Sequence, residues 1–394
     1  NKINSKSIRK NLQKMSLIPS TFFEQIILMK DESFRKFSPI SKTFKVAVIG
    51  GGRWGQIIVR ILSGLNNVSN ICFVSNSNFQ NIRQWIEKSS LEDKNFSKVV
   101  IKKNIDSLIS DKSIKTIFIA SIPSKHFSDA KKLLSAGKHL MVEKPFVPHM
   151  SQAVELLKLA KNKKLTLAVG LEFFCSSYLY NFRDIIKKNV ARIEKVDIVW
   201  QDVFKENRHG ILKLPDMTVN VFKDIFPHIL SILNVLFNHK VTNIKNLYIK
   251  SGGDTCLIQI EYGEFPISIS LSRIAVSAKR KIEIIDQNNQ NLSLDFTSEP
   301  GIINFNGKEL PNDRHWNDLP APVNLEIEFF LREISNPKMK LPFLAENTVS
   351  FVKTIEEGNE MIMNEQIKLI RGFLLENYPT KPSVDVLIAL RENL

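Results

Sequence analysis

Short, continuously apolar runs alternate with amphipathic segments between Lys45 and Val169. Such runs are typical of strands inside a parallel sheet covered on both faces, and the amphipathic segments show the three-to-four-residue period of helices. The pattern predicts strands at Lys45–Ile49, Ile71–Ser75, Val99–Lys102, Thr116–Ala120, Leu140–Glu143 and Leu165–Val169, and helices that include Trp54–Leu65, His126–Ala136 and Met150–Lys161. We therefore predict an N-terminal α/β domain with a parallel sheet over residues 45–169.

The pattern changes after residue 170. A predicted helix at Tyr178–Lys188 is followed by longer segments in which apolar and polar residues alternate, as in strands with one buried face. These strands are Arg192–Asp202, Val241–Lys250, Thr255–Tyr262, Phe265–Arg273, Lys281–Asp286 and Leu292–Phe296, with helices at Asn220–Phe237, Asn324–Ile334 and Ala345–Met363. We predict an α+β C-terminal domain over residues 170–363 with a large, mostly antiparallel sheet, and we expect the last two helices to cover this sheet or the first domain.

Two segments flank these domains. Residues 1–44 are predicted to form a basic N-terminal extension with an apolar helical patch between Phe22 and Leu28, and residues 364–394 a helical C-terminal tail. The extension lacks the continuous apolar core of a signal peptide. The purpose of both segments stays open.

The formal net charge of +15 at pH 7 excludes little by itself, because many lysines stand singly on predicted helix faces, as Lys158 and Lys161 do. No basic stripe with aromatic residues is present, so we expect an anionic small molecule rather than a nucleic acid as partner. No apolar run approaches the roughly 20 residues of a membrane-spanning helix, so no membrane span is expected. The widely spaced Cys72, Cys175 and Cys256 form no CxxC pair, which argues against a zinc cluster or a disulfide framework and favours a reducing, cytoplasmic compartment.

A glycine-rich turn follows the first predicted strand directly. Gly50, Gly52 and Gly55 satisfy GxGxxG between that strand and a helix. In this position the first glycine permits a tight turn, the second lets the backbone approach a pyrophosphate, and the third lets the helix pack on the strand, while the N-terminus of the helix attracts phosphate. We interpret residues 45–169 as a Rossmann dinucleotide-binding domain, with Arg53 and Trp54 of the same turn as further cofactor contacts. A tight turn without a ligand is the alternative.

The end of the second predicted strand bears on the choice of cofactor. NAD-binding domains usually present Asp or Glu here to the adenosine ribose, whereas this chain has Ser75 and Asn76. Without a carboxylate a 2′-phosphate is not repelled, and both side chains can donate hydrogen bonds to it. Arg53 can supply a positive charge. The sequence therefore favours NADP over NAD.

Lys144 stands at the carboxyl end of the fifth predicted strand, in the segment Glu143-Lys144-Pro145. Ligands of open parallel sheets bind at this edge, and Pro145 biases Lys144 towards an extended backbone outside any helix. A lysine beside the cofactor and an exposed lysine at a strand end are both compatible with these residues.

Asp224 and His228 are four residues apart in the predicted helix Asn220–Phe237 and therefore share one face of it. A carboxylate and an imidazole at this spacing suit proton transfer with a substrate oxygen, because histidine titrates near neutral pH. A helix-capping Asp224 and a half-buried structural His228 are the alternative.

The glycine turn, the Glu143-Lys144-Pro145 segment and the pair of Asp224 and His228 together resemble the Gfo/Idh/MocA oxidoreductases, the family of glucose-fructose oxidoreductase and inositol dehydrogenase. The resemblance covers about residues 45–363 and includes a proline and a histidine after the fourth predicted strand. It implies a homo-oligomer, a dimer or tetramer formed through the open face of the second domain's sheet. We expect no metal site.

The resemblance also implies roles for individual residues. The catalytic residues it implies are Lys144, which lies near the nicotinamide and the substrate hydroxyl in the family, and Asp224 and His228, which assist substrate binding and proton transfer. The further cofactor-lining residues it implies are Pro123, His126, Glu143 and Lys144.

This chain departs from the family in two places. Where the family often has DxGxHxxD, Phe226 replaces the glycine and Ser231 replaces the last acid. Phe173 and Phe174 stand where the family often has arginines after the sixth predicted strand. We therefore expect an atypical substrate pocket.

We predict reversible hydride transfer between NADP or NAD and a carbinol or carbonyl carbon of a sugar, nucleotide sugar or polyol-like substrate. His228 exchanges the proton of the substrate oxygen in this prediction, and Lys144 stabilises negative charge on it. Candidates for binding an anionic substrate group are the loop residues Asn207, Arg208, His209 and Lys213. Two alternatives stay open, a nicotinamide-dependent glycoside hydrolase of the same fold and a non-enzymatic cofactor-sensing regulator.

Overall fold

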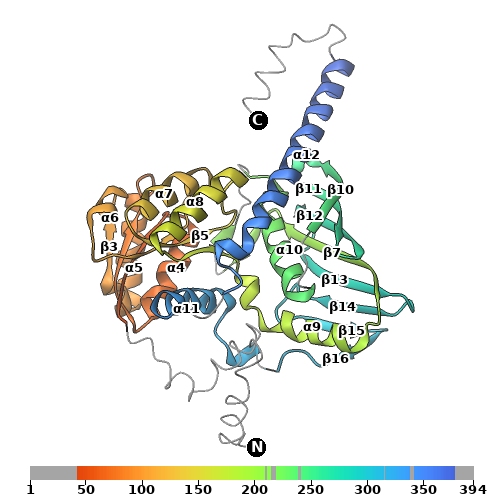
Figure 1. The fold of residues 1–394 in the computed structure, drawn as a ribbon, viewed down its shortest axis with the longest axis horizontal. Coiled ribbons are helices and arrows are strands. Elements are labelled where there is room, and N and C mark those ends of the chain that lie inside the picture. The colour runs from red at the N-terminus through yellow and green to blue at the C-terminus, as the bar shows by residue number, and fades with distance from the viewer. Residues whose placement is uncertain are drawn as a thin grey trace, which may run out of the picture. The chain divides into compact units, whose positions relative to one another are not determined.

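The computed structural model describes residues 42–208, 211–213, 219–237, 241–314, 316–337 and 341–377, without the side chains of residues 206–208, 211–213, 242 and 373–377. The predicted extension up to residue 41 and the tail beyond Asn377 lie outside the described residues. The chain divides into two units, each assembled from separate stretches of sequence (Figure 1). Among the described residues, unit 1 takes those up to Glu143 together with those of Leu156–Tyr180 and Arg314–Asn347, and unit 2 takes those of Lys144–Glu155, Asn181–Asp313 and Thr348–Asn377.

Unit 1 contains a six-stranded parallel sheet with the strand order β3-β2-β1-β4-β5-β6. Its strands are β1 (Phe44–Ile49), β2 (Val68–Val74), β3 (Val99–Lys102), β4 (Thr116–Ile119), β5 (His139–Glu143) and β6 (Leu167–Gly170). The central strands are buried along almost their whole length, which is why their sequences are continuously apolar. The predicted α/β domain with a parallel sheet is confirmed.

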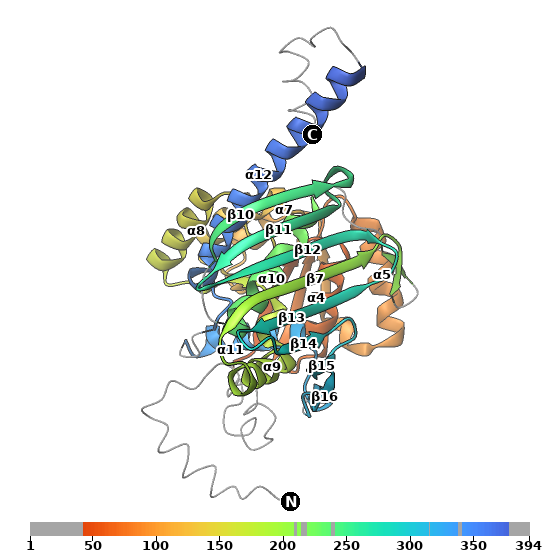
Figure 2. The same cartoon turned by 90° about the vertical axis from the view of Figure 1, so that its right-hand side faces the viewer.

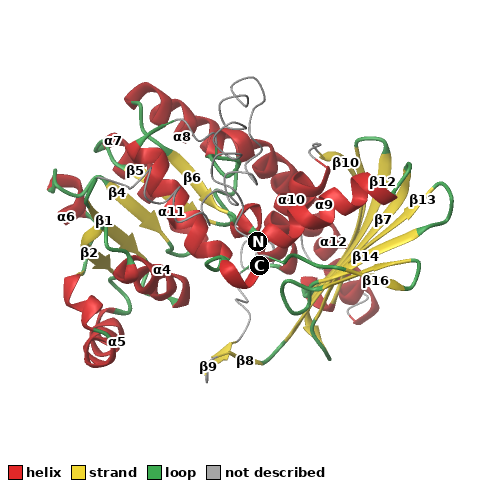
Figure 3. Ribbon diagram, turned by 90° about the horizontal axis from the view of Figure 1, so that it is seen from below, coloured by secondary structure: helices red, strands yellow, loops and turns green. Residues whose placement is uncertain are grey.

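Helices cover both faces of this sheet (Figure 3). The helices α4 (Arg53–Gly64) and α5 (Phe79–Glu92) follow β1 and β2 on one face, and α7 (Pro123–Ser135) follows β4 on the other. The strand order therefore changes direction between β1 and β4, and the edge formed by the carboxyl ends of such strands is where open α/β sheets bind ligands. A short helix α6 (Asp106–Ser110) precedes β4, and α8 (Met150–Lys163) begins in unit 2 and ends in unit 1.

A segment from much later in the chain completes unit 1. The helix α11 (Pro322–Ser335) contributes Phe330, whose ring lies edge-on to that of Phe118 in β4 with the ring centroids 5.6 Å apart. At the edge strand β6, the Val169 amide donates a hydrogen bond of 2.9 Å to the Phe343 carbonyl oxygen. The sequence left open which domain this helix covers, and the structure places it on the first.

Unit 2 contains an eight-stranded sheet with the order β10-β11-β12-β7-β13-β14-β15-β16, seen face-on in Figure 2. Neighbouring strands are antiparallel except for the parallel pair β12 and β7, so the prediction of a mostly antiparallel sheet is confirmed. The strands are β7 (Ile193–Val203), β10 (Val241–Lys250), β11 (Thr255–Tyr262), β12 (Phe265–Ala275), β13 (Lys279–Asp286), β14 (Asn291–Asp295), β15 (Ile302–Phe305) and β16 (Lys308–Leu310). A separate ribbon consists of β8 (Glu206–Arg208) and β9 (Ile211–Lys213).

The sequence did not predict β15 and β16. They are four and three residues long, too short for a two-residue period to stand out. The turn between them, Asn306-Gly307, has positive φ angles of 49° and 82°. Asn-Gly between short strands is a hairpin signal, and it was the feature that could have revealed both strands.

The helices of unit 2 include α10 (Val221–Phe237), most of α9 (Ser177–Asn189) and most of α12 (Ala345–Asn377). The helix α12 continues past Met363, where the sequence predicted its end and separate short helical patterns. The residues that follow favour helix, and Glu365 and Lys368 form an ion pair of 2.6 Å along it, so nothing ends the helix there.

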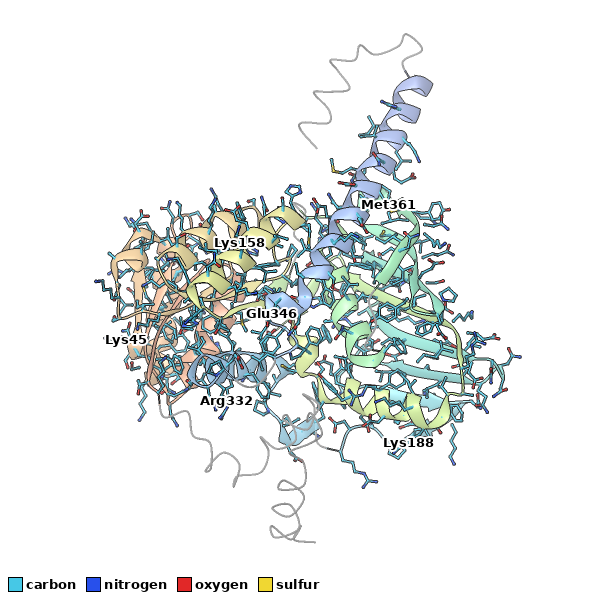
Figure 4. The ribbon with its side chains drawn as sticks, viewed as in Figure 1. Lys45, Lys158, Lys188, Arg332, Glu346 and Met361 are labelled. Atoms are coloured by element: carbon cyan, nitrogen blue, oxygen red, sulfur yellow. The ribbon has the colours of Figure 1, made fainter. Side chains whose placement is uncertain are left out.

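Much of the positive charge lies on the surface, as predicted. The lysines of α8 at positions 158, 161 and 163 and the adjacent Lys164 are all exposed, and Figure 4 labels Lys158 on that helix. In the described residues, no helix combines the length and the hydrophobicity that crossing a membrane requires.

Candidate cofactor site and proton-transfer group

Backbone contacts leave no room for a side chain at two glycines of the turn between β1 and α4. Gly50 has a φ of +113°, and a Cβ atom there would lie 2.2 Å from the carbonyl oxygen of Ala120, just after β4. A Cβ atom on Gly55 would lie 1.8 Å from the Gly50 carbonyl oxygen. Gly52, in contrast, is exposed and has no atom within 4 Å of its Cβ position. The fold thus requires the first and third glycines, and Gly52 keeps the space that an approaching pyrophosphate needs.

The start of α4 suits an anion. The helix begins at Arg53 with no acidic residue in its first turn, and its N-cap Gly52 offers no side chain to the free amides. These amides and the helix dipole favour negative charge. Arg53 is exposed and Trp54 is half-buried. The residues of this turn therefore fit the phosphates of a dinucleotide.

The end of β2 is tied to the glycine turn. Ser75 is buried, and its Oγ lies 2.5 Å from where a Cβ atom on Gly51 would be. Asn78 donates a hydrogen bond of 2.9 Å from Nδ2 to the Gly51 carbonyl oxygen. Asn76 is exposed, so of the two residues chosen from the sequence it is the one that presents its side chain to solvent. Asn78 was missed, and its place directly before α5, typical of a helix N-cap, is the signal that could have identified it.

The loop after β4 is held from inside by His126. Pro123 is half-buried and is the first residue of α7. His126 is completely buried, and its Nε2 lies 2.9 Å from the Ser121 carbonyl oxygen. The ring therefore fixes the course of the loop that follows β4.

A buried carboxyl group lies behind the end of β5. The Glu143 carboxylate lies against Gly170 of β6, where an added Cβ atom would approach it to 2.8 Å. Glu326 of α11 is 2% exposed and accepts a hydrogen bond of 2.5 Å from the Leu171 amide. Burial raises the pKa of Glu326 well above its usual value, and the nearby charges of Glu172 and Glu143 raise it further. A single Glu in an amphipathic helix gives no sequence signal of this kind, and Glu326 was missed.

Lys144 and Asp224 form a close pair within unit 2. The Lys144 ammonium donates hydrogen bonds to Oδ1 of Asp224 at 2.7 Å and to the backbone carbonyl oxygen of the same residue at 2.8 Å. The Lys144 side chain is 10% exposed, and that of Asp224 is 41% exposed. Lys144 is therefore not the exposed strand-end lysine of the alternative interpretation. Ionic hydrogen bonds of this length are among the stronger ones in proteins.

The first turn of α10, which carries Asp224, is anchored at several points. Asn220 caps the helix by accepting a hydrogen bond of 2.9 Å from the amide three residues on, and its Nδ2 donates to Asn359 of α12 at 3.2 Å. Arg273 of β12 donates to the Val219 carbonyl oxygen and pairs with Asp254 at 2.5 Å. The capping role thus falls to Asn220, which leaves the Asp224 carboxylate to Lys144.

His228 is 7% exposed and lies one turn after Asp224. The two unusual residues around it belong to the packing of α10: the Ser231 hydroxyl donates to the His228 carbonyl oxygen at 2.8 Å, and Phe226 stacks on Phe222 with ring centroids 4.4 Å apart. The sequence predicts proton transfer for Lys144, Asp224 and His228, and for this prediction we refer to the three residues as the proton-transfer group.

Two other parts of the sequence were expected to bear on substrate binding, the pair of Phe173 and Phe174 and the loop before α10. Phe173 and Phe174 are buried in unit 1. In the loop predicted to bind the substrate, His209 lies outside the described residues. The side chains of Asn207, Arg208 and Lys213 are likewise not described. Within the described residues, no group of three or more His, Cys, Asp or Glu side chains could hold a metal ion.

Comparison with known sequences identifies relatives of the parallel sheet. Residues 44–171 match the family described as "Oxidoreductase family, NAD-binding Rossmann fold". The uncharacterized oxidoreductase YhhX of Escherichia coli (strain K12) is 39% identical over 72 residues, which are 18% of this chain and 21% of that protein. The matched segments of the first curated relatives span only about a fifth of their length.

Solved structures share the fold over most of the chain. UDP-N-acetylglucosamine 3-dehydrogenase GnnA from Acidithiobacillus ferrooxidans is 16% identical with a TM-score of 0.64, and the match covers 82% of this chain and 99% of that one. KijD10, a 3-ketoreductase from Actinomadura kijaniata in complex with TDP-benzene and NADP, is 12% identical with a TM-score of 0.65, over 80% of this chain and 96% of that one. At these identities the likeness shows the fold alone.

Proposed function

Because residues 44–171 belong to the Gfo/Idh/MocA family of NAD-binding oxidoreductases, we propose that the whole chain is a nicotinamide-dependent dehydrogenase or reductase. The proposed reaction is reversible hydride transfer between NADP or NAD and a carbinol or carbonyl carbon. The observation that carries the proposal is the close pair of Lys144 and Asp224, one helical turn before the buried His228.

The proton-transfer group performs complementary tasks in this proposal. His228 accepts the hydroxyl proton when the substrate is oxidised and returns it when the carbonyl is reduced. The Lys144 ammonium stabilises the negative charge that develops on the substrate oxygen. Asp224 holds that ammonium in place through its carboxylate and its backbone carbonyl. The bound nicotinamide supplies or accepts the hydride.

The cofactor is held by unit 1 in this proposal. The turn at Gly50, Gly52 and Gly55 and the first amides of α4 take the pyrophosphate, and Trp54, Pro123 and Glu143 line the cofactor beside them. We propose NADP as the preferred cofactor because the end of β2 presents the exposed amide of Asn76 and no carboxylate, with the exposed Arg53 in the adjacent turn. Ser75 is buried and packs against Gly51 of the glycine turn.

We propose a sugar, nucleotide sugar or polyol-like substrate. GnnA is named a UDP-N-acetylglucosamine dehydrogenase, and KijD10 was solved with a TDP-linked compound. The shared fold and the positive net charge support an anionic, nucleotide-linked substrate for this chain as well.

We also propose a cytoplasmic homo-oligomer. The three cysteines are buried free thiols, which suits a reducing compartment. On the β10–β11 pair, Tyr248 and Leu257 face each other across the strands and are 56% and 38% exposed. These apolar side chains support association through this face of the sheet. Size-exclusion chromatography with light scattering tests it, and a monomer at high concentration would contradict it.

The test of the activity uses the full chain with NADP⁺ or NAD⁺ and a panel of probes, namely UDP-N-acetylglucosamine, myo-inositol and glucose, while the absorbance of reduced nicotinamide is recorded. We expect one of these classes to reduce the cofactor, with NADP⁺ preferred. Lys144→Met should lower turnover about a hundredfold, because it removes a charge that acts on the developing oxyanion. Its affinity for NADP⁺ should stay within about twofold of that of the unsubstituted chain, since the pyrophosphate contacts are untouched.

The matched control is Lys158→Met, which removes an exposed lysine of α8 and should change neither quantity. Unchanged turnover in Lys144→Met would contradict the proposed role. Release of a sugar without net change in absorbance would show a hydrolase instead. Cofactor binding without turnover of any probe, together with cofactor-dependent capture of a protein partner, would show a regulator.

A further inference from the structure

The ring of His228 lies on an aromatic support that the sequence did not reveal. Trp200 lies three residues before the end of β7, which is a central strand of the unit 2 sheet (Figure 2), and it is 3% exposed. Its indole stacks on the His228 imidazole, with ring centroids 5.8 Å apart and an interplanar angle of 7°. Phe296, just after β14, lies edge-on to the same indole at 5.8 Å and 77°. The indole is therefore enclosed, and its plane matches that of the histidine.

A cation holds this indole from the neighbouring strand. Arg280 of β13 is the cross-strand partner of Trp200, and its guanidinium carbon lies 4.4 Å from the centroid of the indole. This distance is well within the range of a cation–π contact. The same guanidinium donates from Nη2 to Asp202 at 2.9 Å, two residues further along β7 on the same face. Trp200 is thus fixed by its strand, by Phe296 and by a paired cation.

The ion pair of Arg280 and Asp202 is largely withdrawn from water. The side chains of Arg280 and Asp202 are only 17% and 18% exposed. An ion pair withdrawn from water often contributes little net stability, since the loss of hydration offsets the attraction. Its place against Trp200 points to a role in orienting the indole.

Stacking suits a histidine that transfers protons. The N–H bond and the lone pair of an imidazole lie in the plane of the ring, so a partner stacked on its face fixes the ring plane without competing for the proton. A general acid or base contributes only when its nitrogen lies within hydrogen-bond reach of the substrate oxygen. A rotated ring would therefore lose the reaction even with the residue present.

We propose that Trp200 is a positioning residue for His228, and that Arg280, held by Asp202, fixes Trp200 in turn. The functional part of this inference rests on the proposed function, because only a proton-transferring histidine gains from a fixed ring plane. Neither Trp200 nor Arg280 contacts the reacting atoms in this scheme. Both act through the imidazole.

The experiment records nuclear magnetic resonance of the imidazoles in the full chain labelled with ¹⁵N-histidine, without cofactor or substrate. His228→Asn identifies the His228 signals. In the unsubstituted chain we expect the His228 ring protons to be shifted upfield by the indole, and the ring to occupy one tautomer. Trp200→Leu should abolish the upfield shift and mix the tautomers, whereas Trp200→Phe, which keeps an aromatic face, should retain part of both. Arg280→Gln should broaden the signals, and Arg280→Lys should restore them in part.

The matched control is Trp85→Phe in unit 1. Trp85 also lies under a guanidinium, that of Arg60 at 5.8 Å, and against two phenylalanine rings. Its replacement should leave the His228 signals unchanged. Unaltered signals of the other histidines in each variant show that the fold persists. His228 signals that are unchanged in Trp200→Leu would overturn the proposal.

A kinetic comparison completes the test with the probe that gives turnover, UDP-N-acetylglucosamine being the first choice. Trp200→Leu should lower kcat about tenfold or more with little change in the KM for NADP⁺, and Trp200→Phe should recover most of it. Normal kcat in Trp200→Leu would overturn the positioning role. If the unsubstituted chain turns over no probe, the proposed function fails, whereas the imidazole signals still decide whether Trp200 orients His228.

Discussion

The glycine turn of unit 1 and the proton-transfer group of unit 2 are built by different means. The turn owes its shape to backbone atoms, because Gly50 and Gly55 lie where any side chain would collide with a carbonyl oxygen. The proton-transfer group owes its geometry to side chains, since Lys144 and Asp224 are 80 residues apart and meet through hydrogen bonds. A site made of backbone should be destroyed by one added carbon atom. A site made of side chains should survive such changes and fail when a charge is removed.

The largest effect should follow from adding one carbon atom to the turn. Gly55→Ala places a Cβ atom 1.8 Å from the Gly50 carbonyl oxygen, so the turn must shift, and we expect a loss of about 3 kcal/mol in the free energy of unfolding. Urea unfolding of the full chain measures it, and NADP⁺ titration should show weakened binding. The matched control is Gly64→Ala at the other end of α4, where nothing lies within 4 Å, and it should be neutral or stabilising. Equal stabilities of the two variants would show that the turn is not determined by its backbone contacts.

A smaller effect, on turnover rather than on stability, should follow when a charge is removed without a change in side-chain shape. Asp224→Asn should lower turnover about tenfold, because Lys144 loses the carboxylate that holds it. The free energy of unfolding should change by less than about 1 kcal/mol, since the Asp224 side chain is 41% exposed and its pair is screened by solvent. Initial rates and urea unfolding measure the two quantities. Asp197→Asn, which breaks the exposed pair with Lys195, should alter neither. An Asp224→Asn variant with a clearly lower free energy of unfolding but unchanged turnover would reverse the comparison.

The smallest effect should be a gain in thermal stability when Glu326 is replaced by Gln. The pKa of Glu326 is raised in the folded chain, mainly by burial, so this carboxyl favours folding below its unfolded pKa of about 4.3, and the contribution is lost as the pH rises through the folded pKa. Glu326→Gln keeps the oxygen that accepts from the Leu171 amide and has no proton to lose. It should unfold at a higher temperature than the unsubstituted chain at pH 8, and the difference should vanish near pH 4.

Thermal unfolding across this pH range measures that gain. Glu328→Gln, at a half-buried position of the same helix, serves as the control for the exchange of Glu for Gln. A Glu326→Gln variant that is less stable than the unsubstituted chain at pH 8 would contradict this prediction. It would mean that the ionised Glu326 carboxylate stabilises the fold near the end of β5.

The sequence was sufficient to predict those structural elements that depend on residues close together in the chain. The strands of the first sheet, the longer strands of the second, the GxGxxG turn and the amphipathic α10 are local patterns, and the structure confirms them. The short strands β15 and β16 carry too few residues for a period, and the end of α12 was placed too early because no breaker follows Met363.

The proton-transfer group was proposed as one set from the family resemblance, whereas the residue patterns alone gave Lys144 and the pair of Asp224 and His228 separately. The spacing of Asp224 and His228 suggested that these two residues act together, whereas the structure joins Asp224 to Lys144 and places His228 on Trp200. Contacts between distant segments depend on how the sheet aligns its strands, and no local pattern reports them. Glu326 and Arg280 were missed for the same reason, since a lone charge in an amphipathic segment is usually a solvated one.

The interleaved order of the two units has a consequence for how the chain is made. The strands β1 to β6 leave the ribosome early, but α11, which packs Phe330 against Phe118 in β4, is synthesised only after the whole sheet of unit 2. During translation the apolar region of the parallel sheet around Phe118 therefore remains uncovered until α11 is made. Exposed apolar surface of this kind favours aggregation and chaperone binding. A ribosome stalled before Pro322 would display a nucleotide-binding sheet without its last helix, and a chain truncated near residue 170 would remain in that unfinished state permanently.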